Sequence, residues 1–189
     1  MNQGQLFYLM GPSGAGKDSL INYARQHLND PVRFKFVRRL VTRPTNPGDN
    51  NNDDNLSPGE FERQQAADNF ALNWKRHGIR YGIPTEINAW IKTGIHVIIN
   101  GSRHHYPIAR KTYPDLHAVW ITADPAILKQ RLLKRGRETL EKINERMQSA
   151  DKFSPPEPTF NHKASIIKNN GSLNEAGEQF VQLLSQANR

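Results

Sequence analysis

The chain has 189 residues, which is long enough to bury one core of ordinary size. It has no cysteine, so disulfides and thiolate metal sites are excluded. Its 26 lysines and arginines against 18 acidic residues give a net charge of +8, which fits a nucleic-acid binder or an enzyme for multiply phosphorylated substrates. The basic residues are dispersed, without a Lys/Arg tract or aromatic residues interleaved with basic ones, so we expect a small anionic substrate and consider nucleic acid the less favoured partner.

Short apolar segments alternate with amphipathic segments along the chain. This pattern is typical of βαβ units and a mainly parallel sheet, and it therefore predicts an α/β fold. The predicted strands cover residues 5–10, 34–40, 95–100, 116–122 and 163–168. The predicted helices cover residues 17–28, 84–93, 103–112, 125–135 and 172–187.

The segment after the first strand has the spacing G-x-x-x-x-G-K of a phosphate-binding loop. Small residues let consecutive backbone N–H groups converge on an anion, and the following helix directs the positive end of its dipole to the same point. Lys17 adds a full positive charge at the β and γ phosphates, so we predict that it is catalytic. The residues predicted to bind ATP are Gly11, Pro12, Ser13, Gly14, Ala15, Gly16, Lys17, Asp18 and Ser19.

Asp18 stands where a hydroxyl residue normally follows the loop lysine, and the hydroxyl of Ser19 comes one position late. One interpretation is that the Asp18 carboxylate engages Mg²⁺, directly or through water, because this ion prefers oxygen ligands. The other is that Asp18 complements the helix N-terminus, which favours acidic residues in its first turn. The sequence leaves both open, and we name Asp18 as the candidate magnesium ligand.

Two helix boundaries are marked by their chemistry. The run Ser57-Pro58-Gly59-Glu60 combines an N-cap, a proline at the first helical position and a glutamate that can close a capping box. Asp124-Pro125 opens a leucine-containing helix, and Gly136 is a natural stop for it. Both boundaries support the predicted alternation of strands and helices.

Two segments hold few residues that could enter the core. Residues 44–55, rich in Asn and Asp, predict a mobile loop. Residues 136–160 mix charges with three prolines and predict a helical excursion that returns through an extended tail. Residues 57–83, which lie between them, carry enough apolar side chains for a small subdomain of helix and strand. A kinase that closes around a second substrate needs two such movable pieces.

Three motifs resemble those of the guanylate kinases. Their Thr-Thr-Arg-x-Pro motif on the acceptor side resembles Val41-Thr42-Arg43-Pro44 of this chain. Their Tyr-Gly turn resembles Gly78-Ile79-Arg80-Tyr81-Gly82, and their lid motif resembles Arg131-Leu132-x-x-Arg135-Gly136-Arg137-Glu138. The departures also matter: Asp18 replaces Ser or Thr, the Asn/Asp-rich loop replaces Gly-Glu-x-x-Gly-x-x-Tyr-x-Phe, and Val97–Arg103 lacks an acidic strand end. A guanine base would therefore lose its expected hydrogen-bond partners.

A wider combination of motifs runs through the chain: Gly-Pro-Ser-Gly-Ala-Gly-Lys-Asp-Ser, Arg39-x-x-Thr42-Arg43, Leu72-x-Trp74, His77-Gly78-x-x-Tyr81-Gly82, Asn100-Gly101-Ser102-Arg103 and Arg135-Gly136-Arg137-Glu138. This combination is similar to the ribose 1,5-bisphosphate phosphokinases of the phosphonate-utilisation (carbon–phosphorus lyase) pathway, over residues 5–184. The resemblance implies a three-layer, guanylate-kinase-like P-loop fold. It also implies the reaction ATP + ribose 1,5-bisphosphate → ADP + 5-phosphoribosyl 1-diphosphate, with Mg²⁺ as cofactor.

With this resemblance we expect one kinase domain over residues 1–189. Its core would comprise 1–43, 84–135 and 161–189, with an acceptor-side insertion of about 44–83 and a lid of about 136–160.

Phosphoryl transfer between two polyanions is mainly a problem of positioning and charge neutralisation. Arg135 and Arg137 on the lid would close over the transferring group, because guanidinium groups match phosphate oxygens in pairs. We name both, with Lys17, as catalytic candidates. For Arg131 and Arg146, a solvated helix face is an equally good interpretation.

The candidate substrate-binding residues are Arg43, Tyr81, Asn100, Ser102 and Arg103. Arg43 and Arg103 each follow a predicted strand, at the carboxyl end where open α/β sheets bind ligands. Asn100 and Ser102 would bind sugar hydroxyls, and Arg103 would bind a phosphate. Tyr81 is included because of its Tyr-Gly context.

Several neighbouring residues are given structural interpretations. For Arg39, a surface position on a strand is as good an interpretation as a role on the acceptor side. No metal-ligand spacing is evident among His77, His104 and His105, and a phosphate is already a competent nucleophile, so we expect structural roles for all three. Trp74 is expected in the core.

Three functions remain open: the ribose bisphosphate kinase, a nucleoside monophosphate kinase of the guanylate type, and a non-catalytic guanylate-kinase-like binding domain. Degenerate domains of the last kind tend to lose the loop lysine and the lid arginines, and this chain keeps both. The expected partners are a small sugar phosphate and a nucleotide, and we leave a homodimer open. The chain lacks the layout of a signal peptide and any apolar run near the ~20 residues of a membrane span, so we expect a cytoplasmic protein.

Overall fold

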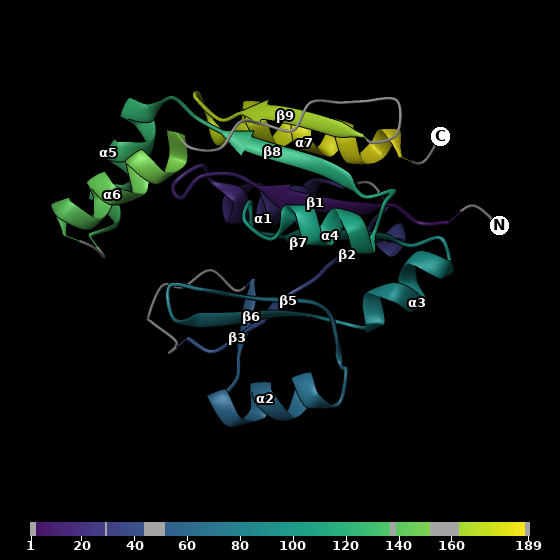
Figure 1. Cartoon of the computed structure of the whole chain (residues 1–189). Helices are drawn as coiled ribbons and strands as arrows, with labels where there is room; N and C mark the ends of the chain where they lie inside the picture. The colour runs from purple at the N-terminus through teal and green to yellow at the C-terminus, as the bar shows by residue number, and fades with distance from the viewer. Residues whose placement is uncertain (1–2, 29, 44–51, 137–138, 152–162, 188–189) are drawn as a thin grey trace.

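The computed structural model describes residues 3–28, 30–43, 52–136, 139–151 and 163–187. Over these residues the chain is an α/β protein with a central parallel sheet, as the sequence predicted (Figure 1). In chain order the elements are β1 (Leu6–Met10), α1 (Lys17–His27), the short 3-10 helix η1 (Pro31–Arg33), β2 (Phe34–Phe36), β3 (Arg39–Val41), β4 (Asp53–Asn55), α2 (Pro58–Ala66), β5 (Phe70–Arg76), β6 (Ile79–Pro84), α3 (Glu86–Lys92), β7 (His96–Asn100), α4 (Tyr106–Thr112), β8 (His117–Thr122), α5 (Pro125–Arg135), α6 (Leu140–Asp151), β9 (Ala164–Lys168) and α7 (Leu173–Gln186).

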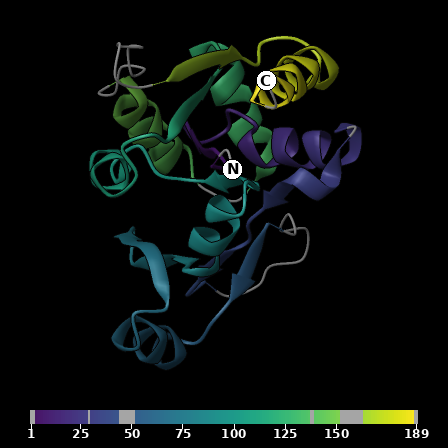
Figure 2. The ribbon, with the colours of Figure 1, turned by 90° about the vertical axis from the view of Figure 1, so that its right-hand side faces the viewer.

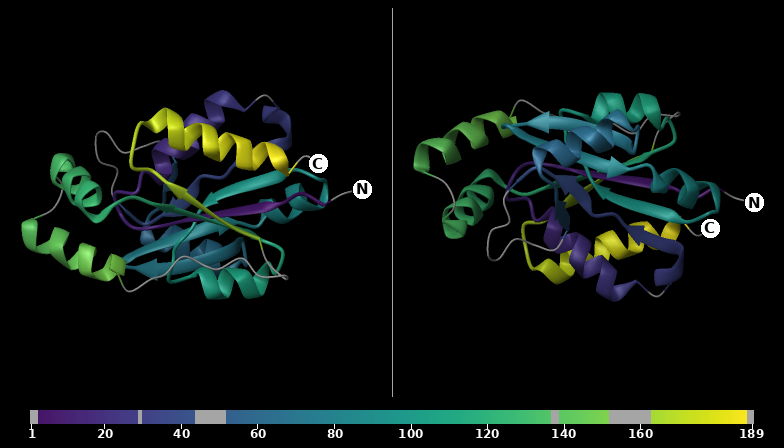
Figure 3. Two further views of the ribbon diagram at one scale, coloured as in Figure 1. Left: turned by 90° about the horizontal axis from the view of Figure 1, so that it is seen from above. Right: turned by 90° about the horizontal axis from the view of Figure 1, so that it is seen from below.

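The main sheet joins five strands in the order β2-β7-β1-β8-β9, all of them parallel. Every residue of β1 and β7 is buried, which explains why both strands read as continuous apolar runs. Helices α1 and α7 cover one face of this sheet, and α3 and α4 cover the other (Figure 3). The three layers enclose two apolar clusters, one on each side of the sheet.

Because the strands are parallel, their carboxyl ends lie at one edge of the sheet, where such folds bind ligands. The loops after β1, β7, β8 and β9 meet there, and α5 and α6 extend beyond the same edge (Figure 3). This edge is therefore the place at which the predicted site residues can come together.

The second sheet has the strand order β4-β3-β6-β5 and lies below the main sheet, with α2 beside it (Figure 2). Phe61 of α2 is 1% exposed, and its ring lies 4.6 Å from the ring of Phe70 in β5. The predicted capping box is confirmed, since the Ser57 hydroxyl accepts from the Glu60 N–H at 3.2 Å and the Glu60 carboxylate accepts from the Ser57 N–H at 2.8 Å.

The prediction of one continuous strand over 34–40 is wrong. The chain forms two short strands that belong to different sheets, since β2 pairs with β7 and β3 pairs with β4 and β6. The change of sheet occurs after Val37, whose N–H still donates to the carbonyl oxygen of Ile98 in β7 at 2.9 Å. As a result, Arg39 belongs to the second sheet and Arg43 directly follows its strand β3.

The prediction of a loop over all of 44–55 is also wrong, because Asp53–Asn55 form the strand β4. This strand is held by pairing with β3 and by the ion pair of Asp53 with Arg39, rather than by burial of apolar side chains. A polar sequence can therefore form a strand here without any apolar pattern. Residues 44–51 lie outside the described residues.

Helix α5 ends as predicted at Gly136, which has a φ of +61° in the left-handed region that favours glycine. The helical part of the predicted excursion over 136–160 is present as α6, while the predicted extended tail falls within 152–162, outside the described residues. No helix within the described ranges combines the length and apolar character needed to cross a membrane.

Candidate active site

The turn between β1 and α1 forms the predicted phosphate-binding loop. Gly14 and Gly16 have φ angles of +86° and +90°, a left-handed conformation that strains residues with a Cβ. A Cβ on Gly16 would also collide with the side-chain amide of Asn169. The Lys17 ammonium donates to the carbonyl oxygens of the first two loop residues, each at 3.1 Å. The loop therefore has a shape from which backbone N–H groups and a lysine can hold phosphate.

Asn169 holds this loop from the end of β9, and the sequence analysis missed it. Its side chain is 3% exposed and donates from Nδ2 to the carbonyl oxygen of Ala15 at 2.9 Å. Its backbone N–H donates to the carbonyl oxygen of Thr122 at 2.7 Å. The available signal was its position directly after a predicted strand, at the same sheet edge as the loop.

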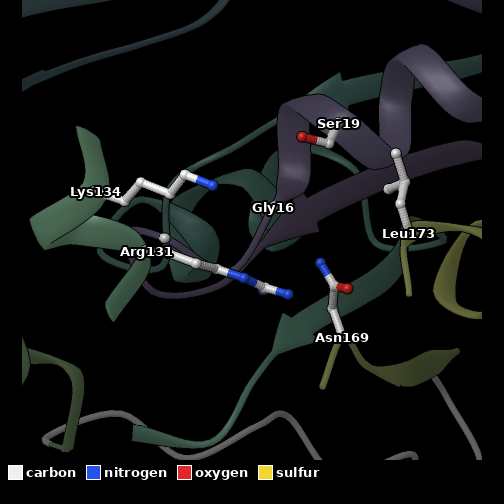
Figure 4. Close-up of a pocket in the computed structure, with 7 residues that line it drawn as sticks. Gly16, Ser19, Arg131, Lys134, Asn169 and Leu173 are labelled. Carbon is white, nitrogen blue, oxygen red and sulfur yellow. The ribbon is translucent and has the colours of Figure 1, made fainter. Parts of the chain in front are cut away.

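A pocket of about 290 Å³ opens beside the loop, and its lining residues are Gly14, Gly16, Ser19, Arg131, Lys134, Asn169 and Leu173. Figure 4 shows the side chains of Arg131 and Lys134 reaching from α5 toward the space in front of Gly16 and Ser19. Within the described part of the chain, the Nη1 of Arg131 is buried without a hydrogen-bond partner. Since such a group costs free energy until an acceptor arrives, the pocket suits an anionic oxygen. Arg131, whose role the sequence left open, thus belongs to a pocket.

Asp18 connects the loop to the end of β7. Its Oδ1 accepts from the Nδ2 of Asn100 at 2.8 Å, and its carbonyl oxygen accepts from the Nδ2 of Asn52 at 3.4 Å. Asp18 also lies in the first turn of α1, where the helix dipole favours an acid. The structure thus brings a predicted donor-side residue and a predicted acceptor-side residue into direct contact.

Arg39 and Arg43 share the carboxylate of Asp53. Arg39 donates from Nε to Oδ1 at 2.7 Å and from Nη2 to Oδ2 at 3.0 Å, and Arg43 donates from Nη2 to Oδ2 at 3.0 Å. Burial acts to lower the pKa of Arg39, but Asp53 and, to a smaller extent, Asp18 outweigh it and raise that pKa. Arg39 is therefore not a surface residue of its strand, and Asp53 is a second residue that the sequence analysis missed.

The segment Asn100–Arg103 makes a closely packed turn after β7. The Tyr8 hydroxyl accepts from the backbone N–H of Ser102 at 2.8 Å and donates to its carbonyl oxygen at 3.0 Å. Gly101 lies against the Tyr8 ring, where a Cβ would collide. Among the described residues, the buried Oγ of Ser102 has no hydrogen-bond partner, so this hydroxyl suits a polar ligand group.

Arg103 is 7% exposed, which is unusual for an arginine. Its guanidinium carbon lies 5.9 Å from the centre of the Trp120 ring. Burial and, next, the nearby Arg76 of β5 lower the pKa of Arg103 to about 10, so the group stays charged at neutral pH. Two cations thus lie close together where β7 ends and the β5–β6 hairpin turns, an arrangement that suits a phosphate.

Tyr81 belongs to a column of stacked groups. Its ring stacks on Trp74 at 5.3 Å with 8° between the planes, and Trp74 stacks on His105 at 5.2 Å. The guanidinium carbon of Arg39 lies 5.3 Å from the centre of the Tyr81 ring. Burial lowers the pKa of His105, in keeping with a structural role. The column supports Arg39, whereas a contact of Tyr81 with substrate stays a prediction.

The lid arginines are described only in part. Arg135 is the last residue of α5 and follows Lys134, which lines the pocket. Arg146 lies in α6, and Arg137 lies outside the described residues. The catalytic roles of Arg135 and Arg137 therefore stay predictions.

Comparison with known proteins gives a consistent picture. The family model described as guanylate kinase matches residues 3–187. The ribose 1,5-bisphosphate phosphokinase PhnN of Thiobacillus denitrificans is 43% identical over 187 residues, which cover 99% of this chain and 96% of that protein. The protein of the same name from Chromobacterium violaceum is 42% identical over 186 residues, covering 98% of this chain and 96% of the relative.

Two solved structures resemble the fold. The guanylate kinase from Anaplasma phagocytophilum has a TM-score of 0.68 with 14% identity, covering 98% of this chain and 86% of the other. A sugar kinase from Janibacter sp. HTCC2649 has a TM-score of 0.53 with 14% identity, covering 96% and 95% of the two chains. At these identities the likeness concerns the fold alone, and it confirms the predicted guanylate-kinase-like architecture.

Proposed function

This chain belongs to the guanylate kinase family and, within it, to the ribose 1,5-bisphosphate phosphokinases, and we propose that it transfers the γ-phosphoryl group of ATP to ribose 1,5-bisphosphate. The products are ADP and 5-phosphoribosyl 1-diphosphate. The observation that carries this choice of substrate is the identity of 41–43% to enzymes of that name over almost the whole chain. The geometry supports it, because a phosphate-binding loop and several arginines lie at one edge of the sheet.

We infer that ATP occupies the loop and the pocket beside it. The loop N–H groups and Lys17 would hold the β and γ phosphates. Arg131 and Lys134 line the adjoining pocket and would meet further oxygens of the nucleotide. From the resemblance of the lid motif, we expect Arg135 and Arg137 to act on the transferring group.

The reaction needs little acid–base chemistry. An oxygen of the acceptor's 1-phosphate attacks the γ-phosphorus of ATP, and the bond from that phosphorus to the β,γ-bridging oxygen breaks, so that ADP leaves with the bonding electrons. The second pKa of a phosphate ester is about 6, so the attacking group is already an anion near pH 7. The protein must chiefly supply alignment and positive charge, as Lys17 would on the donor side and Arg43 and Arg103 on the acceptor side.

We infer that Mg²⁺ accompanies ATP at the first turn of α1. This ion prefers oxygen ligands and usually combines one or two carboxylates with water and phosphate oxygens. The Asp18 carboxylate and the Ser19 hydroxyl fit that preference. The buried Oδ1 of Asn100, which has no hydrogen-bond partner in the described part of the chain, adds an oxygen beside Asp18. When bound, the ion would neutralise charge on the β and γ phosphates.

The Asp18→Asn substitution tests this role of Asp18, because an amide oxygen can still accept from Asn100 while the charge is lost. If Asp18 holds the ion, half-maximal turnover in Asp18→Asn should need several-fold more Mg²⁺, and Asp18→Ser should be tolerated better than Asp18→Ala. If Asp18 serves only the helix dipole, thermal unfolding should report a loss of about 0.3–1 kcal/mol with unchanged magnesium dependence.

Two other functions are less well supported. A nucleoside monophosphate kinase would share the donor loop, but three arginines on the proposed acceptor side (Arg39, Arg43 and Arg103) suit a substrate with two phosphates better than a purine base. A non-catalytic binding domain would have no need of Lys17 and a glycine-built loop.

An acceptor panel tests the proposal. ADP release would be measured with ATP, Mg²⁺ and either ribose 1,5-bisphosphate, GMP or other nucleoside monophosphates. We expect kcat/KM to be at least about 100-fold higher for ribose 1,5-bisphosphate, which corresponds to roughly 2.7 kcal/mol of discrimination. A preference for GMP would identify a guanylate kinase, and a lack of ADP release with every acceptor would favour the binding domain.

We further propose a cytoplasmic location, because ATP and sugar bisphosphates are intracellular metabolites. A homodimer remains a prediction, which light scattering after size-exclusion chromatography would test.

A further inference from the structure

The Asp53 carboxylate lies between two arginines, and it and Arg39 are largely withdrawn from solvent while Arg43 is partly exposed. The side chain of Asp53 is 8% exposed, against 13% for Arg39 and 31% for Arg43. Arg39 binds both carboxylate oxygens, in the parallel geometry that gives the strongest arginine–carboxylate pairs. Arg43 uses one of its terminal nitrogens on the same carboxylate and remains the more exposed of the two arginines.

Arg39 is fixed on its other sides as well. Its Nη1 donates to the carbonyl oxygen of Asn100 at 3.3 Å, and its guanidinium lies over the Tyr81 ring. Three segments of the chain therefore fix one guanidinium group. Asp53 contacts both arginines, so it links the orientation of one guanidinium group to that of the other.

The start of β4 also contacts the donor side. Asn52, which is 3% exposed, accepts from Arg25 of α1 at 3.1 Å and donates to the Asp18 carbonyl oxygen at 3.4 Å. Its own carbonyl oxygen accepts from the Arg39 N–H at 3.2 Å. Asn52 and Asp53 thus join the helix that follows the phosphate-binding loop to the arginines of the second sheet.

We propose that Asp53 is a positioning residue for phosphoryl transfer, which orients Arg39 and Arg43 so that the acceptor phosphate meets two aligned guanidinium groups at a fixed place relative to the loop. This inference rests on the proposed function. An arginine side chain carries about 2 kcal/mol of rotamer entropy, and a phosphate that binds free arginines must overcome that ordering. Asp53 orders both before the substrate arrives, and two arginines with one carboxylate keep a net positive charge for the phosphate.

The opposite role for Asp53 is a competitor that occupies the arginines in place of phosphate. Both roles use the same contacts, but they predict opposite changes in the affinity for the acceptor when the Asp53 charge is removed. If Asp53 orients the arginines, removal of its charge weakens acceptor binding. If Asp53 competes, the same change strengthens it.

The chain supplies a matched control in the neighbouring residue. Asp54 lies on the same strand and pairs with Arg38 at 2.7 Å, but both side chains are 47% exposed. We expect Asp53→Asn to raise the KM for ribose 1,5-bisphosphate at least tenfold, while the KM for ATP changes less than twofold. Asp54→Asn should change neither value. Asp53→Glu, which restores the charge on a longer side chain, should recover part of the loss.

A double-mutant comparison separates positioning from a general loss of structure. If Asp53 acts through Arg39 and Arg43 together, then Asp53→Asn should raise the acceptor KM by a smaller factor in an Arg43→Ala background than in the wild type, because only Arg39 is left to be oriented. An unchanged or lower acceptor KM in Asp53→Asn, or an equal rise in the KM for ATP, would overturn the proposal. If Asp53→Asn does not fold, Asp53→Glu replaces it in the test. A rise in its acceptor KM without an equal rise in its KM for ATP supports the proposal, and an unchanged or lower acceptor KM overturns it.

The failure of the proposed function would be visible separately. Wild-type protein that uses GMP but not ribose 1,5-bisphosphate would disprove the proposed substrate, and the KM ratio measured with GMP would still test Asp53. Titration of ribose 1,5-bisphosphate into protein saturated with ADP gives the acceptor Kd without turnover. A tenfold rise in that Kd in Asp53→Asn, but not in Asp54→Asn, supports the positioning role, and equal Kd values contradict it.

Discussion

The proposed donor region and the proposed acceptor region of this protein are held by different forces. The donor region, residues 11–19, is fixed by its backbone, with left-handed glycines and the amide of Asn169 bound to a loop carbonyl oxygen. The acceptor region consists of Arg39, Arg43, Asp53 and Asn100, whose side chains and carbonyl groups bind one another across 10 to 61 residues of sequence. The first region depends on chain geometry, and the second depends on charge.

This difference predicts which substitutions harm which substrate. A backbone-held loop cannot accept an added Cβ without strain where φ is positive. A group of buried ions can tolerate small steric changes, whereas removal of one partner leaves an uncompensated charge at a cost of about 3–5 kcal/mol. Steric changes in the loop should therefore act on ATP, and changes of charge in the acceptor region should act on the sugar phosphate.

The largest effect is expected from Lys17→Ala, which removes the positive charge that we propose holds the donor phosphates. We expect kcat to fall at least about 100-fold, since loss of a group that stabilises charge in the transition state costs roughly 3–4 kcal/mol. The protein should remain folded by circular dichroism. Lys129→Ala, which changes an exposed lysine of α5, should leave kcat unchanged. Folded Lys17→Ala protein that keeps most of its activity would refute the loop assignment.

Gly16→Ala should harm the donor region by shape alone. The added Cβ meets the Asn169 amide at a φ of +90°, so we expect at least about tenfold weaker ATP binding and a loss of roughly 1–3 kcal/mol in the free energy of unfolding. Gly59→Ala is the matched control, because a Cβ there meets nothing within 4 Å. Placed in α2, it should stabilise the protein by about 0.5–1 kcal/mol. Equal effects of the two substitutions on ATP binding and on the free energy of unfolding would show that the backbone geometry of the loop does not determine ATP binding.

Arg43→Ala tests the acceptor region by charge, and Arg103→Ala tests the neighbouring turn after β7 in the same way. Each should raise the KM for ribose 1,5-bisphosphate about tenfold or lower kcat, because a phosphate loses a guanidinium partner, while the KM for ATP changes less than twofold. Steady-state kinetics with each substrate varied in turn gives both values. Arg63→Ala, which changes an exposed arginine of α2, should alter neither. Equal loss of ATP affinity would place these arginines on the donor side.

The smallest effect concerns the scaffold that carries both regions. Burial and, to a smaller extent, Lys163 lower the pKa of His117 in β8 from 6.5 to about 4, and the ring lies 2.8 Å from the Ser165 hydroxyl. Between pH 6.5 and 4, His117 is therefore protonated in the unfolded chain but neutral in the folded chain. The free energy of unfolding is at its maximum above about pH 6.5 and falls as the pH drops toward 4. After allowance for partial exposure, we expect a loss of about 1–2 kcal/mol.

Chemical denaturation at several pH values measures this loss, and His117→Gln should flatten the profile over the same range. His117 begins its strand, at the end of the sheet opposite the candidate site. Retention of the full pH dependence in His117→Gln would show that another group is responsible. Activity that is lost in acid because the protein unfolds can thereby be distinguished from activity that is lost because the donor or acceptor region changes its protonation.

The sequence predicted those features that depend on residues close together in the chain. The loop, the capping box at Ser57 and the stop at Gly136 were recognisable because their physics is local. Asp53 and Asn169 were missed for the opposite reason. Their roles depend on ion pairs and hydrogen bonds to residues 14 and 154 positions away, which no local pattern reveals.

The errors follow the same rule. Residues 34–40 carry an apolar pattern typical of a strand, but the change of sheet inside them depends on which partner strands are available. Asp53–Asn55 carry no apolar pattern at all, because charge rather than burial holds the strand β4. Composition predicted that residues 44–55 have almost nothing to bury, yet Asn52 and the Asp53 side chain are buried, because arginines stabilise this strand.

The most direct test of the central claim is the identity of the product. Phosphorus NMR would follow ATP and Mg²⁺ with ribose 1,5-bisphosphate, and in parallel with GMP, in the presence of wild-type protein. We expect loss of the sugar 1-phosphate signal, appearance of the coupled signals of a diphosphate at that position, an unchanged 5-phosphate signal, and ADP in equal amount. Conversion of GMP to GDP with no change in ribose 1,5-bisphosphate would contradict it.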